Sequence, residues 1–508
     1  MGFFFTLLFV FTAYVSPTIL FGSLAQYHIE IVIAAITLFT SLLSMEDSGV
    51  SRMPQTYALI GLLGAVTMSL LLVGWMGGVY EGLVDFIPNI MVFFFVVWNC
   101  KTKRQLQMLV VVLLAAALWI VLQGHIATVN LDRNSLYVLR MRNDEGAGFF
   151  RIRGQTFLND PNDLAQFFVA LIPMLFFFWR KGSVITNLLF VYVPGFALFY
   201  GMFLTHSRGG MVAMMACVVV AGRKKVGVVP SMIVGGLIFV GLTLSGFSGG
   251  RDVGAGDDRM EAWSMGLTLI RSHPIFGVGF KRFTEYYEIT AHNTIIVCAA
   301  EVGLVGLFFW MLFIFPTIRD MFVASADPAA EEQKKLQDEE KQPRMPKLRR
   351  DFITVPRTKL AFSHGAESAV GGGRAPLLRA GFKPSESDVP ARGVGLRSVR
   401  VAPFSPGLVD DAEEGQFMAE GEIRRMASIM MVSFAGFLAA GWFISRPYTM
   451  SLFLNAGIST VIFRLARNHG ILKETLPMGR AMRISAFLSV ALVILVYVFL
   501  RVDKLFPK

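Results

Sequence analysis

The sequence predicts an all-α protein that crosses a membrane many times. Of its 508 residues, 54% are hydrophobic and only 16% are charged, and the mean hydropathy is +0.57. Apolar runs of membrane-spanning length recur along most of the chain. Because a bilayer core about 30 Å thick needs roughly 20 apolar residues per helix, these runs predict about 12–13 transmembrane helices.

Each predicted span is an apolar run bounded by polar or charged residues. No secretory signal with a small-residue cleavage site precedes the first run, so we expect that run to remain as an anchor. The predicted spans cover residues 3–22, 28–45, 56–75, 82–99, 106–123, 162–179, 184–204, 207–222, 226–245, 292–316, 427–444, 449–463 and 484–500.

Basic segments orient these spans, because the positive-inside rule places Lys and Arg in cytoplasmic loops. They lie in alternate loops, at residues 101–104, 179–182, 222–225 and 464–483. The loops at 124–161, 205–210 and 246–291 then face outward. The net charge of +11 follows from this topology and does not indicate nucleic-acid binding.

The three cysteines, Cys100, Cys217 and Cys298, lie in or beside different spans and lack CxxC spacing. We therefore expect them to act as small core side chains rather than as disulfides or metal ligands.

The pattern divides the chain into four parts. Residues 1–123 form the N-terminal helices, and 124–317 form a membrane core with long outward loops at 124–161 and 246–291. Residues 318–425 are rich in Pro, Gly and charged residues and lack an apolar period, which predicts a disordered cytoplasmic insert. This insert is either a solvated linker or a segment that binds a partner. Residues 426–508 return to transmembrane helices.

The first long outward loop contains five arginines, which is unusual on the face with few positive charges. They are Arg133, Arg140, Arg142, Arg151 and Arg153. Long loops escape the positive-inside rule, so topology alone can explain these arginines. Alternatively, some of them bind an anionic ligand outside the membrane.

The second long outward loop predicts an amphipathic helix on the outer membrane surface. Met260, Trp263, Leu267 and Ile270 recur there at helical spacing, and Pro274 closes the run.

An arginine interrupts the apolar sequence at "LTHSRGG", residues 204–210. Ser207 or Thr205 can cap the helix that contains Arg208, and the two glycines after Arg208 leave the first-turn N–H groups open. A helix N-terminus and a guanidinium together suit an anion such as phosphate. The alternative is an arginine that only snorkels to the interface.

Two other span starts carry polar residues of interest. His292 begins one of them and is followed by Asn293. A histidine there is either an interfacial residue or a base for a hydroxyl group. At the other, Asp160 and Pro161 fit a helix cap, while Asn162 would face a nearby cavity.

Four segments in this order resemble the O-antigen ligase and O-antigen polymerase superfamily. They are "TFLNDPNDLAQ", "LTHSRGG", "DDRMEAW" with "RSHPIFGVGF", and "AHNTIIVCAAEVGLVGL". The resemblance covers about residues 150–316, since the flanking spans are similar only in hydropathy. The predicted insert at 318–425 departs from the family pattern.

This resemblance implies a bacterial inner-membrane glycosyltransferase with a lipid-sugar-dependent, GT-C-like architecture. Such enzymes take a glycan from undecaprenyl diphosphate on the periplasmic face and pass it to another glycan, to lipid A–core or to protein. It also implies that Arg208, Arg259 and His292 are the key residues.

As a mechanism, we expect the two arginines to stabilise the leaving diphosphate and His292 to deprotonate the acceptor, with inversion. His206 is the rival base. The candidate substrate-binding residues are Arg151, Arg153, Asn162, His206, Ser207 and Asn293. We expect no metal and no cofactor. Proteins of the polysaccharide export pathway are possible partners, and the alternative function is a transporter or flippase of an anionic lipid-linked sugar.

Overall fold

A computed structural model describes residues 1–43, 53–142, 148–223, 225–244, 255–326, 420–472 and 476–505. These residues belong to one compact unit, which clusters residues 1–328 with 411–508. Most of the insert predicted at 318–425 lies outside the described residues. Its two described ends are helical, because α13 (Thr294–Ser325) continues past residue 318 and α15 (Glu420–Gly441) begins before residue 426.

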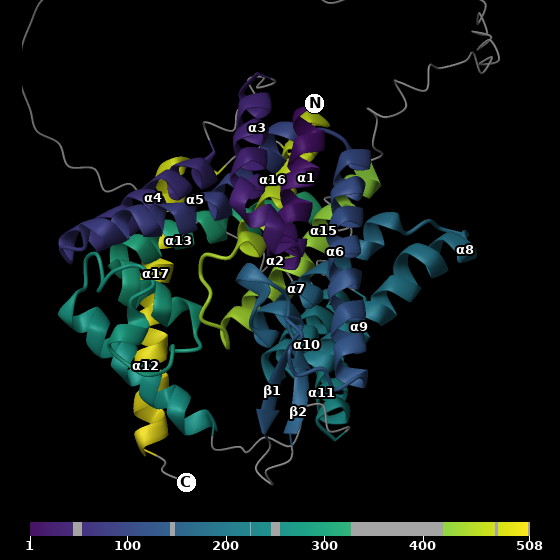
Figure 1. Cartoon of the computed structure of the whole chain (residues 1–508). Helices are drawn as coiled ribbons and strands as arrows, with labels where there is room; N and C mark the ends of the chain where they lie inside the picture. Colours follow the sequence, from purple (N-terminus) through teal and green to yellow (C-terminus); the bar gives the residue numbers. More distant parts are fainter. Residues whose placement is uncertain are drawn as a thin grey trace, which may run out of the picture. The chain divides into compact units, whose positions relative to one another are not determined.

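The described residues form a multi-pass, all-α membrane architecture, as the sequence predicts (Figure 1). Among these residues, eight helical segments are long and apolar enough to cross a membrane. They are α4 (Pro54–Leu72), α5 (Met76–Asn99), α6 (Lys103–Val129), α7 (Pro161–Met174) with its 3₁₀ turn to Phe178, α8 (Val184–Asn187) joined to α9 (Val193–Thr205), α13, α15 and α17 (Met478–Leu505).

Four shorter apolar helices account for further predicted spans. They are α1 (Gly2–Val15), α3 (Ile29–Leu43), α10 (Arg208–Gly222) and α11 (Val228–Leu244). A one-turn helix, α2 (Pro17–Leu20), follows α1.

The core of the unit surrounds α16 (Met450–Asn468). Every residue from Met450 to Phe463 is buried, and the helix packs against α5, α13 and α15. By contrast, α17 and α9 keep large apolar side chains such as Ile494 and Phe196 exposed. Exposed apolar faces of this size are what lipid-facing helices require.

A β-hairpin occupies part of the loop expected at 124–161. Strand β1 (Val138–Arg142) pairs antiparallel with β2 (Gly148–Ile152), so that Leu139 lies opposite Arg151. The sequence does not reveal this hairpin, because each strand has only five residues and too short an alternating pattern.

The helix expected in the second outward loop is α12 (Ala255–Ser272), which ends two residues before Pro274. It buries Trp263 and Ile270, and it packs against α13 and α17. The Trp263 Nε1 group donates a hydrogen bond to the carbonyl of Ala291 at 2.6 Å. This contact ties α12 to the segment just before α13.

Candidate functional site

Three helices of the unit begin with capped N-termini that carry the residues singled out in the sequence. Asp160 caps α7 by accepting from the N–H of Asn162, and Ser207 caps α10 by accepting from that of Gly210. Asn293 caps α13 by accepting from two N–H groups. Each helix start adds about half a positive charge to its surroundings.

Asn162 joins two of these helix starts. Its Oδ1 accepts a hydrogen bond from Ser207 Oγ at 2.9 Å and one from Arg151 Nη2 at 3.0 Å. Arg151, which is 4% exposed, also donates from Nε to the carbonyl of Thr205 at 2.7 Å. The Asn162 amide and the Arg151 guanidinium therefore hold together the hairpin, the end of α9 and the starts of α7 and α10.

The glycine pair after Arg208 allows close packing. A Cβ at Gly209 would lie 3.1 Å from Cβ of Phe443, and one at Gly210 would lie 3.0 Å from Cβ of Ala165. Both glycines are buried. Small residues at this position let the start of α10 approach α7 and the segment after α15.

Arg208, Arg259 and His292 share one electrostatic neighbourhood with Asp160. Burial first, and the nearby Arg208 cation second, lower the pKa of Arg259, against an opposing effect of Asp160. An arginine remains charged at neutral pH even so. Two like cations held together in a partly buried site favour an anion between or beside them.

His292 stands in this cationic field as a neutral group. Burial first, and Arg259 second, lower the pKa of His292 from its ordinary value of 6.5, while Asp160 opposes them. At pH 7 the imidazole is therefore unprotonated and can accept a proton.

A cavity of about 1310 Å³ opens beside these residues. Its lining comes from α1, α3, α5, the start of α7, the segment 280–292, α13 and the segment 444–450. His292, Asn162 and Asp160 line the cavity, whereas Arg208 and Arg259 do not. Arg259 is coupled electrostatically to His292 and to Arg208. The cavity is large enough for a sugar and part of a lipid carrier.

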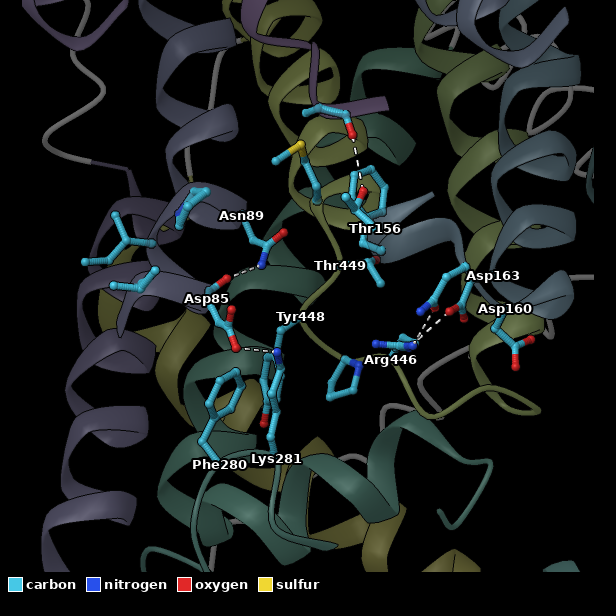
Figure 2. Close-up of a pocket in the computed structure, with 18 of the residues that line it drawn as sticks. Asp85, Asn89, Thr156, Asp160, Asp163, Phe280, Lys281, Arg446, Tyr448 and Thr449 are labelled. Atoms are coloured by element: carbon cyan, nitrogen blue, oxygen red, sulfur yellow. Dashed lines mark hydrogen bonds and ion pairs between the residues drawn. The ribbon is translucent and has the colours of Figure 1, made fainter. Parts of the chain in front are cut away.

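Arg446 is a charged cavity residue that the sequence reasoning missed. Figure 2 shows it pointing at Asp163, and its Nε lies 3.0 Å from Oδ2 of that carboxylate. Asp163 is only 3% exposed on its side chain, against 41% for Arg446. The signal that could have identified it is an arginine, in "ISRPYT", in a loop that the span pattern predicts to lie on the side with few positive charges.

The segment that carries Arg446 crosses from α15 to α16 and is fixed at several points. Thr294 Oγ1 donates to the carbonyl of Ile444 at 2.7 Å, and Trp310 Nε1 donates to that of Pro447 at 2.8 Å. Both donors belong to α13. The start of α13 and the position of Arg446 are consequently coupled.

A break in α13 explains the glycines of "HPIFGVGF" and "EVGLVGL". Gly303 has φ 69° and ψ −175° inside the helix. The freed carbonyls of Ala300 and Glu301 accept from the N–H groups of Val278 and Gly279, both at 2.9 Å. Non-helical backbone at membrane depth is tolerated where such partners satisfy it. The break thus holds the 274–280 segment beside the cavity.

Several non-glycine residues of the cavity wall have left-handed backbones. Ser16, Thr156, Lys281 and His292 line the cavity with φ of 50°, 47°, 60° and 46°. Such conformations cost about 1–3 kcal/mol each and gather at functional sites. Four strained residues around one cavity make this cavity the candidate functional site.

The remaining predicted residues lie nearby with mixed roles. His206 ends α9 with φ 48°, and its ring meets Phe149 edge-on at 5.4 Å. Arg153 Nε donates to the carbonyl of Leu136 at 3.2 Å. Asn293 is fully buried, and its Nδ2 has no hydrogen-bond partner among the described residues. The three cysteines are free and buried, as the sequence predicts.

The comparison with known families supports the importance of this region. Residues 193–311 match a family model described as O-antigen ligase, Wzy_C. The match begins at α9, includes Arg208, Arg259 and His292, and confirms the resemblance noted in the sequence over that range. No curated protein matches the chain.

Proposed function

We propose that this chain, a relative of the O-antigen ligases over residues 193–311, is a glycosyltransferase of the bacterial inner membrane. It takes a glycan from undecaprenyl diphosphate and passes it to an acceptor on the periplasmic face. The observation that carries this proposal is that Arg259 interacts electrostatically with Arg208 and with His292, whose side chain lines the cavity.

The two arginines suit a diphosphate better than a singly charged group. Arg208 stands at the start of α10, so the partial positive charge of the helix adds to its own. Arg259, on α12, is close enough for the charge of Arg208 to lower its pKa. As the glycosidic bond breaks, negative charge grows on the departing diphosphate, and fixed cations stabilise that charge most strongly in a partly buried site.

In this proposal His292 acts on the acceptor. In the transfer, an acceptor hydroxyl oxygen attacks the anomeric carbon while the bond from that carbon to the diphosphate oxygen breaks. The electron pair leaves with the diphosphate, and the proton of the hydroxyl passes to the neutral imidazole. Attack opposite the leaving group inverts the anomeric centre.

Asn162, Arg151 and Ser207 support this chemistry as positioning residues. Their hydrogen bonds fix the start of α10 relative to α7, and through it the direction of Arg208. Buried as they are, Arg151 and Ser207 act on the arginine rather than on the substrate.

The acceptor is a second glycan, lipid A–core or protein, which corresponds to a polymerase, a lipopolysaccharide ligase or a protein glycosylation enzyme. Partners of the export pathway would supply the lipid-linked donor. A strain lacking the chain separates the first two possibilities. Restored long polymer identifies a polymerase, and restored attachment of preformed chains to lipid A–core identifies a ligase.

The same strain tests the enzyme against the transporter. We expect the parent chain to restore the surface glycan, and Arg208→Ala and His292→Ala to fail at equal membrane levels. If both variants restore it fully, the diphosphate-and-base assignment is wrong. Counterflow of the lipid-linked sugar in vesicles, without any new glycosidic bond, would establish the transporter instead.

A further inference from the structure

The cavity has a second polar wall, on the side of α5, which the transfer chemistry does not use. We call Tyr80, Asp85, Asn89 and Lys281 the α5 wall. Lys281 Nζ lies 2.7 Å from Asp85 Oδ2, and the two side chains are 57% and 53% exposed. Figure 2 shows this ion pair on the opposite side of the pocket from Arg446 and Asp163.

The placement of Asp85 on a membrane-spanning helix needs an explanation. Asp85 lies in α5, one turn after Glu81, and by length and composition this helix can cross a bilayer. A charged side chain in hydrocarbon costs about 2.5–3.5 kcal/mol. An ionisable residue on such a helix that faces a hydrated cavity is therefore a candidate functional residue. Asp85 does line the cavity.

Two backbone features lie beside this wall. Pro88 lies inside α5 and cannot donate a helix hydrogen bond, while Asn89 Nδ2 donates to the carbonyl of Asp85 at 2.7 Å. Lys281 has a left-handed backbone, with φ 60°. It lies just beyond Phe280 and Gly279, and the N–H of Gly279 donates a hydrogen bond to the carbonyl of Glu301 at the break in α13. Strain of this kind persists only where the surroundings enforce it.

The charges of the α5 wall favour a neutral ligand. Lys281 and Asp85 cancel each other, in contrast to the cationic neighbourhood of Arg208 and Arg259. The wall offers a carboxylate, an amide and an ammonium, so it can both accept and donate hydrogen bonds. Tyr80, 74% exposed, adds an aromatic face against which an apolar sugar face can pack.

We infer that the α5 wall binds a neutral, hydroxyl-rich sugar of a lipid-linked glycan. This inference rests on the proposed function, because it assigns a sugar subsite in the cavity where the diphosphate would be bound by other residues. The sugar belongs either to the donor, next to its diphosphate, or to the acceptor. Both present the same hydroxyl chemistry, and the experiment separates them.

Binding to the full chain in nanodiscs tests this inference. Sugar-based detergents must be absent, because they would compete. The donor probes are undecaprenyl diphosphate and undecaprenyl-diphosphate N-acetylglucosamine, and the acceptor probe is hexyl β-glucoside below the concentration that disrupts the discs. The variants are Asp85→Ala and Asn89→Ala. Glu81→Gln is the matched control, since Glu81 is exposed on the same helix and does not line the cavity.

We expect Asp85→Ala and Asn89→Ala to weaken the binding of a sugar-bearing probe about tenfold, the loss typical of one or two hydrogen bonds. Undecaprenyl diphosphate without sugar should bind within twofold of the parent. Weaker binding of the N-acetylglucosamine carrier alone identifies the donor sugar, and weaker binding of hexyl β-glucoside alone identifies the acceptor. Because an exposed ion pair adds little stability, the thermal midpoint should not change.

The inference is overturned if both variants bind all sugar-bearing probes like the parent, or if they weaken the bare carrier equally. Arg208→Ala separates this failure from failure of the proposed function. Its binding of the bare carrier reports the diphosphate site alone. If Asp85→Ala binds the sugar-bearing probes normally while Arg208→Ala binds the bare carrier weakly, only the sugar subsite is refuted. If Asp85→Ala binds the sugar-bearing probes weakly while Arg208→Ala binds the bare carrier normally, only the diphosphate assignment is refuted.

Discussion

Replacing Asn162 by alanine should damage the site without touching either proposed catalytic arginine. The change removes the acceptor that Arg151 and Ser207 share. Arg151 is 4% exposed, so losing a partner of this buried cation costs about 1–3 kcal/mol. The hydrogen bond from the Ser207 hydroxyl is worth about 1 kcal/mol more. We therefore expect the free energy of unfolding to fall by about 2–4 kcal/mol.

The same substitution should slow the transfer reaction. Ser207 caps the helix that begins with Arg208, so loosening its contact with α7 lets the guanidinium shift. A misplacement of about 1 Å can cost about a hundredfold in rate. The assay pairs thermal unfolding in nanodiscs with kcat/KM for glycan transfer.

Asn162→Asp provides the rescue, because a carboxylate keeps the acceptor oxygen for both donors. Asn134→Ala is the control, as Asn134 is exposed on the loop after α6. If Asn162→Ala matched the parent in both thermal midpoint and kcat/KM, the shared amide could not be what aligns α10 with α7. Equal damage by the aspartate variant would also refute the argument.

The remaining predictions concern protonation, packing and charge. Because burial and Arg259 hold the pKa of His292 below 6.5, the neutral base is retained as pH falls to that value and is lost only below it. The acid limb of kcat/KM should lie below pH 6.5 and move to higher pH in Arg259→Gln, whereas an unmoved limb would exclude His292 as the titrating base. Gly303→Ala would place a methyl group 2.1 Å from the carbonyl oxygen of Ile275, so the yield of folded protein should collapse. Gly64→Ala, with nothing within 4 Å, should not affect it, and equal yields would contradict the role of the α13 break. Arg446→Ala should leave the buried Asp163 unpaired and lower the thermal midpoint. The double variant Arg446→Ala with Asp163→Asn should lower it less. If the thermal midpoint of the double variant is no higher than that of the single variant, the lost ion pair is not the cause.

Local signals in the sequence predicted the helix starts well. Asp160 followed by Pro161, and Ser207 followed by Arg208, form the caps that the structure has. Caps depend on a few neighbouring residues, so a short sequence defines them. The apolar runs likewise predicted the multi-pass helical architecture, since span length follows from bilayer thickness.

The features that the sequence did not reveal depend on distant contacts. Arg446 matters because α15 and α16 bring it to Asp163, 283 residues earlier in the chain. The break at Gly303 frees carbonyl groups of α13, and these accept hydrogen bonds from N–H groups of the 274–280 segment. Likewise, the role of Asn162 as a shared acceptor appears only once the hairpin and α10 lie beside α7. Periodicity and spacing contain no information on such pairings.

Glycan transfer by the purified chain tests the central claim most directly. The parent, Arg208→Ala and His292→Ala would each be given an undecaprenyl-diphosphate-linked glycan and a candidate acceptor in nanodiscs, with EDTA present, and the product measured by mass spectrometry. We expect the parent to form the new glycosidic bond without added metal. Arg208→Ala should be at least about a hundredfold slower, and His292→Ala about a hundredfold or more slower. Transfer by both variants within twofold of the parent would contradict the assignment of the arginine and the histidine.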